Sequence, residues 1–540
     1  MRTYMEARNE TAECCLDWYA FCCSWIRGNE MKRSYLVRSA IVVLCLLVSL
    51  WQTEFSLPLL WERGHYFIDT AARMFPPDTS FLDVILVPLR DTVYISLLGT
   101  VLGGIIGAVG TVLCNGYVNR WKAARIILKA AVHVFRCIPV LILALLCTFV
   151  FGLGMWSGII AVTLSTAAVL SRLGYEDSEN AELKTARVLE YAGAGRFKAW
   201  WVSVWKQILP GYLANLLYLL EANVRNAAVL GFVGAGGIGL LLNEKLAWRE
   251  YSKVGMILCV LYLVVLATES LSGFLRVRLV ESETKHKKWY VPAILCVLFI
   301  IFSFFTGFPT ISEVNKTALE SIVEGVVYPD ITMLFSLGPD EVPALLFESL
   351  CIAFLGTLGG TVFALLLAVL SCFRFLGFAA LLTRLLLLVF RSVPVLVYGL
   401  LWIRVTGPGP FAGVLTMALC SIGLLAKRFL IAIDSIDMKP YYALRASGVG
   451  LLPAVRWAVV PQILPHYLSA VIYRMDINLR EVAVLGLVGA GGIGTPLVLA
   501  MNHYEWKQAG ALLWGLILLA AAAGAVSEKY RRSYRLRKAR

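Results

Sequence analysis

The sequence predicts an all-α polytopic membrane protein with about twelve transmembrane helices in two sets of six. Of its 540 residues, 59% are hydrophobic and 16% are charged, whereas soluble proteins carry about 25% charged residues. The chain also contains long apolar runs, and a transmembrane helix needs about 20 mostly apolar residues. A soluble globular protein of this length needs more polar surface. The composition therefore excludes a cytosolic enzyme, a disordered chain and a secreted disulfide scaffold.

The apolar runs form two sets. The first set is expected at 36–53, 91–113, 134–153, 155–172, 207–230 and 252–274. The second set is expected at 289–307, 347–371, 389–405, 409–427, 462–485 and 508–526. No small-residue cleavage site follows Trp51-Gln52-Thr53. The first run is therefore interpreted as a retained span rather than a signal peptide.

Basic residues predict which ends of the spans face the cytoplasm. Segment 114–136 has five basic residues and no acid, and the tail after Ser527 has seven basic residues and one acid. Segment 308–347 has one basic residue and six acids. Because cytoplasmic loops are enriched in Lys and Arg, we expect a multi-pass protein of the cell (plasma) membrane with both termini in the cytoplasm. Such loops also explain the net charge of +14 without a nucleic-acid partner.

The expected organisation is two six-span domains joined by a cytoplasmic linker. The domains are 31–275 and 289–527, the linker is 276–288, and the basic tail is 528–540. Residues 1–30 precede Met31-Lys32-Arg33, which resembles a natural start, so they are interpreted as a mobile or mispredicted extension. An amphipathic surface helix is the alternative for this segment.

The two domains are predicted to be copies of one another. Residues 206–240 and 461–495 are identical at twenty of thirty-five positions, at a constant offset of 255. The hexapeptides that begin at Arg136 and Arg391 match at the same offset. Because matching spans enter the membrane in the same direction, the repeat is a parallel duplication about an axis along the membrane normal. A two-fold pore between the halves is the expected result.

Each copy contains a dense run of glycines. These residues are Gly234, Gly236, Gly237, Gly239, Gly489, Gly491, Gly492 and Gly494. Both runs fit G-x-G-x-x-G, but a dinucleotide site needs a preceding strand and an acid about 20 residues further on. Here a long apolar helix precedes each run. Dense glycines break a helix and allow close approach of the backbone, so we expect tight re-entrant turns near the outer surface.

The sequence contains no pattern typical of an enzyme. No Walker A motif, Ser/His/Asp arrangement or HExxH motif occurs, and the five histidines lie in unrelated places. The cysteine pairs at 14–15 and 22–23 lack the spacing of a zinc finger. We therefore predict no catalytic residue, no metal ligand and no cofactor bound by the chain itself.

Ionisable residues are predicted inside span five of each half. Glu221 and Arg225 are four residues apart, as are Asp476 and Arg480. Glu221 lies about 16 Å along its helix, near the middle of a ~30 Å hydrocarbon core. Ionisable groups at that depth normally face an interior cavity. The candidate pathway residues are Glu221, Asn223, Arg225, Asp476, Asn478 and Arg480. Ion pairs within one helix that only hold the helices together are the alternative.

A long loop is predicted between spans four and five of each half. Residues 173–206 and 428–461 are polar or mixed, and Gly193 and Gly448 each lie seventeen residues before a proline. Identical spacing in both copies favours a docking element on the membrane face over a plain amphipathic connection.

These features resemble the permease subunits of ATP-binding cassette (ABC) importers. The stretch ALRASG at 443–448, followed by Val460-Pro461, is similar to the family's cytoplasmic coupling loop, roughly E-A-A-x3-G-x9-I-x-L-P. The downstream YRMDINLREVAVLGLVGAGGIG, the upstream GPGPFAGVLTMAL, FPPD at 75–78 and LLGT near Leu98 resemble the phosphonate-importer branch. The resemblance covers about residues 31–532. It implies a tandem duplication of a type I permease unit, where the family usually has one unit per chain and dimerises.

The resemblance also implies partners and contact residues. It implies two copies of an ABC ATP-binding subunit, which bind the ATP, and an extracytoplasmic substrate-binding protein. The ATPase contact is expected at Ala192, Gly193, Ala443 and Gly448. The leading Glu of the family loop is replaced by Arg187 and Tyr442 here, and Lys206 stands at the counterpart of Pro461. The second loop therefore keeps more of the family pattern.

The implied function is a non-catalytic permease for ATP-driven import of phosphonate or a related phosphorus oxyanion, such as phosphite or phosphate, by alternating access. The alternatives are a type I permease for another small solute and an ion-coupled secondary transporter with duplicated halves. A membrane-embedded enzyme is a further rival, and it would need catalytic residues that the sequence does not contain.

Overall fold

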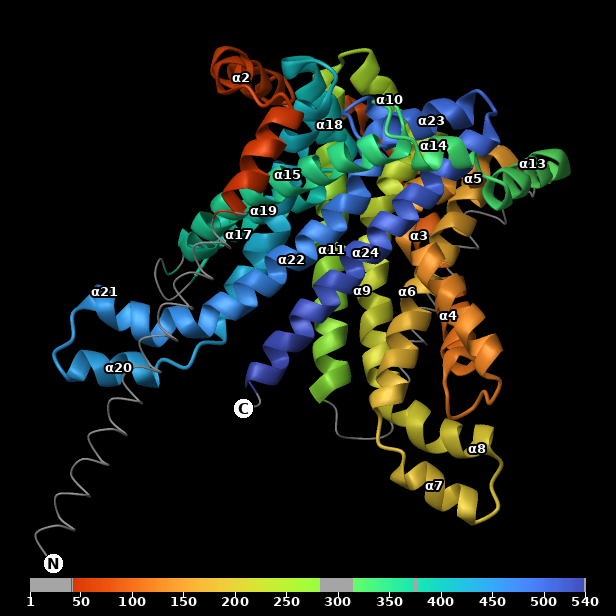
Figure 1. The fold of residues 1–540 in the computed structure, drawn as a ribbon. Helices are drawn as coiled ribbons and strands as arrows, with labels where there is room; N and C mark the ends of the chain where they lie inside the picture. The colour runs from red at the N-terminus through yellow and green to blue at the C-terminus, as the bar shows by residue number, and fades with distance from the viewer. Residues whose placement is uncertain (1–39, 41, 282–313, 373–376, 378, 539–540) are drawn as a thin grey trace, which may run out of the picture. The chain divides into compact units, whose positions relative to one another are not determined.

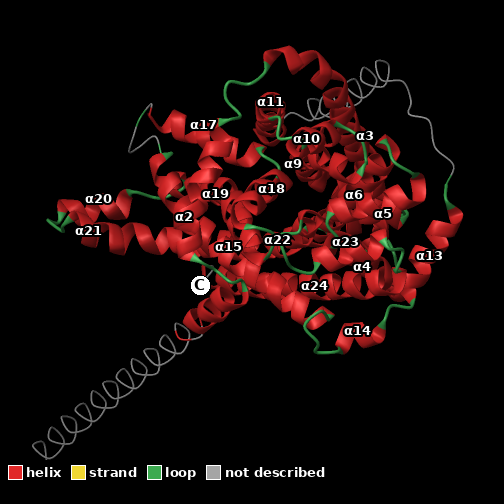
Figure 2. Ribbon diagram, turned by 90° about the horizontal axis from the view of Figure 1, so that it is seen from above, coloured by secondary structure: helices red, strands yellow, loops and turns green. Residues whose placement is uncertain are grey.

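The computed structural model describes residues 40, 42–281, 314–372, 377 and 379–538. The chain divides into two compact units, Met1–Phe55 and Ser56–Arg540. In the first unit, a helix covers residues 42–52, within the expected span 36–53. All other described elements belong to the second unit, and no strand occurs among the described residues (Figure 2). The predicted all-helical fold is confirmed.

The first half of the second unit runs from α2 to α11 (Figure 1). Its long helices are α3 (Leu82–Cys114), α6 (Met155–Asn180), α9 (Lys206–Leu230) and α11 (Tyr251–Glu281). Its shorter helices are α2 (Leu57–Ala72), α4 (Lys122–Cys137), α5 (Val140–Phe151), α7 (Lys184–Tyr191), α8 (Arg196–Trp200) and α10 (Ile238–Ala247).

The second half repeats this order from α13 to α24. Its long helices are α15 (Val342–Leu370), α19 (Pro410–Asp434), α22 (Val460–Leu485) and α24 (Trp506–Lys538). Its shorter helices are α13 (Lys316–Val327), α14 (Ile331–Phe335), α17 (Ala379–Ser392), α18 (Val395–Thr406), α20 (Lys439–Ala446), α21 (Leu451–Ala454) and α23 (Gly494–Asn502).

The number of spans is smaller than twelve in the part of the chain that the structure describes. Seven helices are long and apolar enough to cross a membrane, or up to ten spans if each of three bent helix pairs counts as one. The expected span 289–307 and the extension 1–30 lie outside the described residues.

Two of the expected spans are sharply bent. Residues 134–153 fall on α4 and α5, which are bent by 97°, and residues 389–405 fall on α17 and α18, which are bent by 85°. The cause is a proline at each break, Pro139 and Pro394, which lacks a backbone N–H and disfavours the helical conformation of the preceding residue. Ile138 accordingly has an extended backbone. Hydropathy does not reveal the bend because the apolar run continues through it.

Small residues allow the two principal helix pairs to pack closely. Helix α3 packs along α6, and α15 packs along α19. A Cβ atom placed on Gly99 would lie 2.7 Å from Val162, and one placed on Gly360 would lie 2.5 Å from Ser421. Close backbone approach at small residues is typical of helix packing in membranes.

The two halves of the second unit exchange contacts reciprocally. Helix α11 packs on α17, and its repeat counterpart α24 packs on α4. In the same way, α2 packs on α18 and α13 packs on α5. Each half therefore contributes its last long helix and its first short helix to the other half, as expected for a pseudo-two-fold arrangement.

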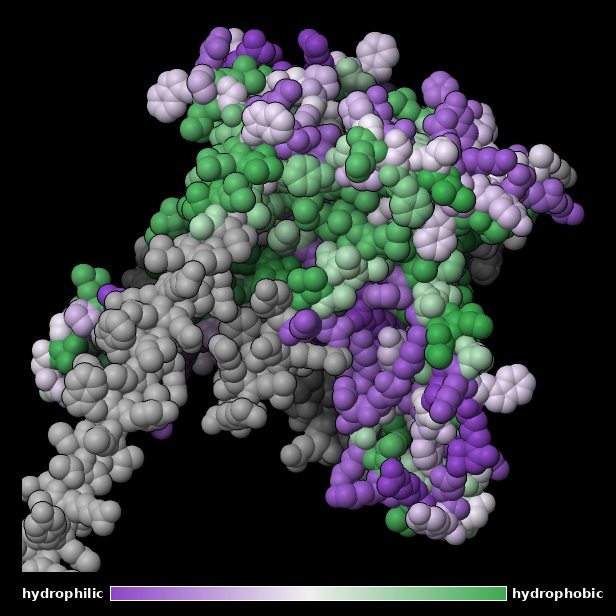
Figure 3. Space-filling view, in the orientation of Figure 1, coloured by the Kyte–Doolittle hydropathy of each residue, from purple (hydrophilic) through white to green (hydrophobic). Residues whose placement is uncertain are grey.

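The surface of the second unit is zoned. Figure 3 shows a hydrophobic zone with hydrophilic side chains on either side of it. Exposed apolar side chains come from α3 (Ile105, Ile106) and from α15 (Val362, Phe363). Large exposed apolar patches on a soluble monomer are unusual, so this zone fits contact with lipid.

Candidate functional site

Helices α9 and α22 carry the ionisable residues that the sequence singles out. In α9, the Asn223 side-chain amide donates to the hydroxyls of Thr100 and Thr166, both at 2.9 Å. In α22, the Asn478 amide donates to Thr357 and Ser421, both at 2.8 Å. Both asparagines therefore join three helices within their own half. Their assignment to the pathway stays a prediction.

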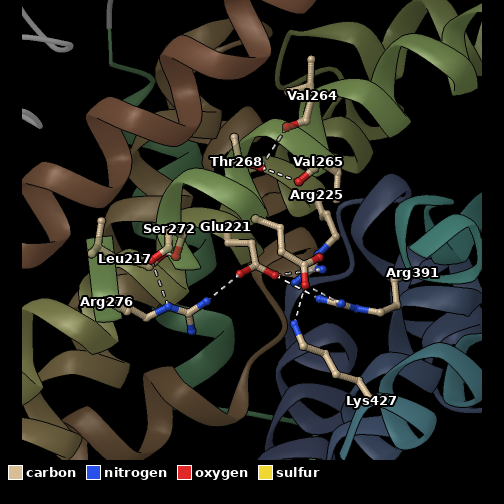
Figure 4. Close-up of polar contacts among 11 residues, drawn as sticks. Leu217, Glu221, Arg225, Val264, Val265, Thr268, Ser272, Arg276, Arg391 and Lys427 are labelled. Carbon is tan, nitrogen blue, oxygen red and sulfur yellow. Dashed lines mark hydrogen bonds and ion pairs between the residues drawn. The ribbon is translucent and has the colours of Figure 1, made fainter. Parts of the chain in front are cut away.

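Glu221 is the centre of an ion-pair cluster between the halves (Figure 4). Its side chain is 1% exposed and lies 3.0 Å from Arg391, 3.4 Å from Arg225 and 3.5 Å from Arg276. Arg391 belongs to α17 of the second half, so this contact joins the halves. The predicted helix-internal pair with Arg225 is present, but it is one of three ion pairs.

Glu269 of α11 completes the cluster. Its carboxylate accepts from Arg391 at 2.9 Å and pairs with Lys427 of α19. We call Glu221, Arg225, Glu269, Arg276, Arg391 and Lys427 the Glu221 cluster. It places four cations against two carboxylates, and its ion pairs across the halves are consistent with a structural role.

The repeat-related position around Asp476 is built differently. Asp476 pairs with Arg480 at 2.9 Å. Arg136, the counterpart of Arg391, has no carboxylate within 4.0 Å among the side chains that the structure describes. Arg480 Nη1 lies 3.4 Å from the backbone oxygen of Arg136.

Two cavities adjoin these clusters. The first has a volume of about 460 Å³ and is lined from both halves, with Tyr218 and Asn223 of α9 facing Tyr473 and Arg480 of α22. The second has a volume of about 540 Å³ and is lined by members of the Glu221 cluster and by Arg428. Such sizes suit small-molecule sites. Cavities lined by cations from both halves can receive a small anion.

The structure brings together some of the predicted pathway residues and adds others. Asn223 and Arg480 line the first cavity, whereas Glu221 and Arg225 line the second. Asp476 and Asn478 are 7% and 0% exposed.

Sequence reasoning missed several charged residues of this region, including Arg276 and Lys427 of the Glu221 cluster. Arg136 and Arg172 line the first cavity, Arg391 lines the second, and Glu269 is bonded to Arg391. Arg136 and Arg391 begin the repeated hexapeptide, which was the signal that could have found them.

The glycine runs form compact turns in both halves. After α9, Gly234, Gly236 and Gly237 have φ values of +77°, +80° and +83°, a region that other residues rarely adopt. After α22, Gly489, Gly491 and Gly492 have φ values of +78°, +81° and +75°.

The remaining glycines of the runs have a different constraint. Side chains at Gly239 and Gly494 would collide with the backbone oxygens of Ala228 and Ala483. The turns are held by repeat-related bonds: Thr92 Oγ1 accepts from the Ile238 amide at 2.7 Å, and Ser349 Oγ accepts from the Ile493 amide at 2.9 Å. Whether these turns lie near the outer surface stays a prediction.

The two long loops form helical hairpins. Helices α7 and α8 form the first hairpin and α20 and α21 the second, at the same end of the unit's long helices (Figure 1). Ala192, Gly193, Ala443 and Gly448 are all exposed. Gly193 and Gly448 terminate α7 and α20 with φ values of +90° and +82°, as expected of a helix C-terminal glycine.

The first hairpin is held more firmly than the second. Trp200 is fully buried and donates to Ser178 at 2.9 Å. Glu190 accepts from Tyr117 at 2.9 Å and from Arg196 at 2.7 Å, and these bonds lower the pKa of its carboxyl group. The second hairpin has Val455, Ile433 and Arg445 at the counterparts of Trp200, Ser178 and Glu190.

Both hairpins present apolar side chains to solvent. Exposed residues are Val188, Tyr191, Phe197, Tyr442 and Leu452, and Trp457 is exposed just after α21. Such patches on a polar end of the molecule are typical of protein contact surfaces. Among the described residues, no group of three or more His, Cys, Asp or Glu side chains is placed to hold a metal ion.

Comparison with protein families identifies the repeat. A family model described as the binding-protein-dependent transport system inner membrane component matches residues 99–280 and 343–530. The chain belongs to this family. The two matches confirm that the permease carries two fused units of the family in one chain and is a multi-pass membrane protein.

Curated relatives of the permease are transport proteins. The phosphate-import permease protein PhnE of Mycolicibacterium smegmatis is 27% identical over 489 residues, covering 88% of this chain and 90% of that protein. HtxC of Stutzerimonas stutzeri, named as a phosphite transport system permease protein, is 30% identical over 270 residues, covering 48% of this chain and 92% of that protein. The suspected relationship to the phosphonate-uptake group of permeases is confirmed.

Solved structures include an inward-facing methionine ABC transporter, MetNI. It is 22% identical, with a TM-score of 0.32, and the match covers 35% of this chain and 93% of that chain.

Proposed function

We propose that this chain is the complete membrane-spanning pore of an ATP-driven importer for a phosphorus oxyanion such as phosphonate, phosphite or phosphate. The observation that carries the proposal is the presence of two family units in one chain, with reciprocal contacts between the halves. The names of the relatives, which concern phosphate import and phosphite transport, support the substrate class. The cations of both cavities suit an anionic solute.

The proposal includes partners. Two copies of a separate ATP-binding subunit would dock on the two hairpins through Ala192, Gly193, Ala443 and Gly448. A substrate-binding protein would dock at the opposite end of the long helices. The termini and both hairpins would then lie in the cytoplasm. ATP-driven closure of the two ATPase subunits would move the hairpins. This movement would rock the two halves between an inward-facing and an outward-facing state.

The decisive experiment is purification of the tagged chain from its native membrane. A P-loop ATPase that copurifies in a 2:1 ratio, and uptake that requires ATP, are the expected results. Uptake of phosphite or phosphonate that is driven by an ion gradient, with no ATPase bound, would instead favour a secondary transporter and overturn the proposal.

One copy of the chain is expected in each assembled transporter. The two halves already contribute their last long helices to each other, so a second copy has no equivalent place to pack. Native mass spectrometry of the purified complex checks this number. Two copies per complex would contradict the prediction.

Arg480→Gln and Arg225→Gln are expected to differ. Arg480 lines the first cavity between α9 and α22 and makes one ion pair, so its neutralisation should lower oxyanion uptake about tenfold, equivalent to about 1.4 kcal/mol. Arg225 shares Glu221 with Arg276 and Arg391, so its loss is expected to be milder. Uptake at matched expression is the measurement. Unchanged uptake in both variants would make these arginines structural.

A further inference from the structure

The two cavities present cations at repeat-related positions. The first contains Arg136 and Arg172 from the first half and Arg480 from the second. The second contains Arg391 and Lys427 from the second half and Arg225 from the first. The members of each pair are 255 residues apart.

Carboxylates line both cavities: Glu176 and Glu481 line the first, and Glu221 lines the second. What differs is how the carboxylates meet the repeat-related arginines Arg136 and Arg391. Arg391, whose side chain is 7% exposed, is bonded to Glu221 at 3.0 Å and to Glu269 at 2.9 Å. Lys427 is also bonded to Glu269. A guanidinium that already holds two carboxylates has few free donors for a third anion.

The first cavity lacks one of these acids. The counterpart of Glu269 is Gly524. A Cβ atom placed on Gly524 would lie 3.6 Å from Arg136 Nη2 and 3.9 Å from Asp476 Oδ1. The missing carboxylate would therefore lie beside Arg136, as Glu269 lies beside Arg391.

Arg136 is left without a counterion among the side chains that the structure describes. Its Nε is buried with no hydrogen-bond partner there, and Nη2 is 3.5 Å from His133 Nδ1. The other two cations of this cavity do have acids: Arg172 pairs with Glu176 at 2.6 Å, and Arg480 pairs with Asp476 at 2.9 Å. A partly buried guanidinium without a counterion is costly, and an anion would relieve this cost.

The second cavity contains more cations in total, because Arg276 and Arg428 also line it. Both of these extra cations already have partners. Arg276 lies 3.5 Å from Glu221, and the Arg428 guanidinium lies 4.2 Å above the ring of Tyr473. Charge alone therefore does not decide between the cavities. Arg391 Nε is also buried without a hydrogen-bond partner, but Arg391 already holds two carboxylates, whereas Arg136 holds none among the described side chains, and this difference favours the first cavity.

We propose that Arg136 forms a one-sided anion-binding site in the first cavity, where its guanidinium binds the oxygen atoms of a tetrahedral phosphorus oxyanion. A guanidinium matches such an anion through two parallel hydrogen bonds. Gly524 stands where the other half has Glu269, so no carboxylate competes with an anion for Arg136 at this position. In the other half, Glu269 already occupies Arg391. This inference rests on the proposed function and assigns its anion to one of two duplicated positions.

The test measures protection of Arg136 in the full chain, purified into lipid nanodiscs without partners. Phenylglyoxal modification of Arg136 is followed by peptide mass spectrometry, with inorganic phosphite or with chloride at equal ionic strength. At ten times its dissociation constant, phosphite should slow modification about tenfold. Gly524→Glu supplies the missing acid and should reduce this protection to less than about twofold.

Two matched variants control for folding and charge. Gly524→Gln adds a side chain of the same size without charge, and protection should persist. Gly273→Glu adds the same charge to α11 at a position with no heavy atom within 4 Å of the new Cβ, so protection of Arg136 should also persist. Equal protection in Gly524→Glu and the parent chain would overturn the proposal, as would loss of Arg136 protection in Gly273→Glu but not in Gly524→Glu.

The same variants separate this inference from the proposed function. If cells that carry the parent chain import phosphite but Gly524→Glu changes neither uptake nor protection, the site is wrong and the function stands. If the parent chain shows phosphite protection at Arg136 but supports no ATP-dependent uptake, the site stands and the function is wrong.

Discussion

Gly448→Arg is expected to abolish most uptake while the partner ATPase continues to hydrolyse ATP. Gly448 is exposed at the tip of the second hairpin, with a φ of +82° and no heavy atom within 4 Å of a Cβ atom placed on it. An arginine there would both strain the turn by about 1–2 kcal/mol and project into the surface proposed to hold the ATPase. Coupling free energies of about 1–3 kcal/mol correspond to changes of about 5–150-fold, so we expect uptake to fall at least about tenfold.

Gly407→Arg is the matched control for this variant. Gly407 has a similar φ of +89° and equally open surroundings, but it lies between α18 and α19, away from the hairpins. Its replacement should cost a similar strain and leave binding of the ATPase unchanged, and ATPase binding is the readout compared because Gly407 lies at the end proposed for the substrate-binding protein. Gly193→Arg is expected to have a smaller effect than Gly448→Arg, because the second loop keeps more of the family pattern. Uptake per ATP hydrolysed is the measurement. A normal value in Gly448→Arg would show that the second hairpin is not part of the ATPase docking surface.

The duplicated architecture could be predicted from sequence because it depends on repeated residues. The offset of 255 aligns the sequence of α9 with that of α22 and the sequence of α11 with that of α24. Both halves follow the same order of helices. The bends at Pro139 and Pro394 were missed because hydropathy averages over the break, although both prolines were visible in the repeated hexapeptides.

The candidate site was predictable only in part. Both i,i+4 pairs are present, Glu221 with Arg225 at 3.4 Å and Asp476 with Arg480 at 2.9 Å. The pairing of Glu221 with Arg391 depends on how α17 packs against the first half. Residue spacing within one helix cannot predict this packing. The contrast between Glu269 and Gly524 was readable from the alignment of the halves, but its meaning requires the position of Arg136.

Removing the Glu221 carboxylate is expected to destabilise the folded chain more than any other single change in the site. In Glu221→Ala, three arginines lose an acid that is 1% exposed, namely Arg225, Arg276 and Arg391. Breaking a buried ion pair from one side costs about 3–5 kcal/mol. The apparent melting temperature of the detergent-purified chain should fall clearly, and the monodisperse fraction should fall with it.

Asp476→Ala provides the comparison within the same chain. Asp476 is the repeat counterpart of Glu221 but makes one ion pair, so its loss should cost less. The double variant Glu221→Leu with Arg391→Leu removes charges of both signs and should recover part of the stability, since apolar replacements of buried ion pairs are often neutral. Equal stability of Glu221→Ala and the parent chain, together with reduced uptake, would instead assign Glu221 to the transport pathway, because a side chain that only holds the halves together cannot alter transport without altering the fold.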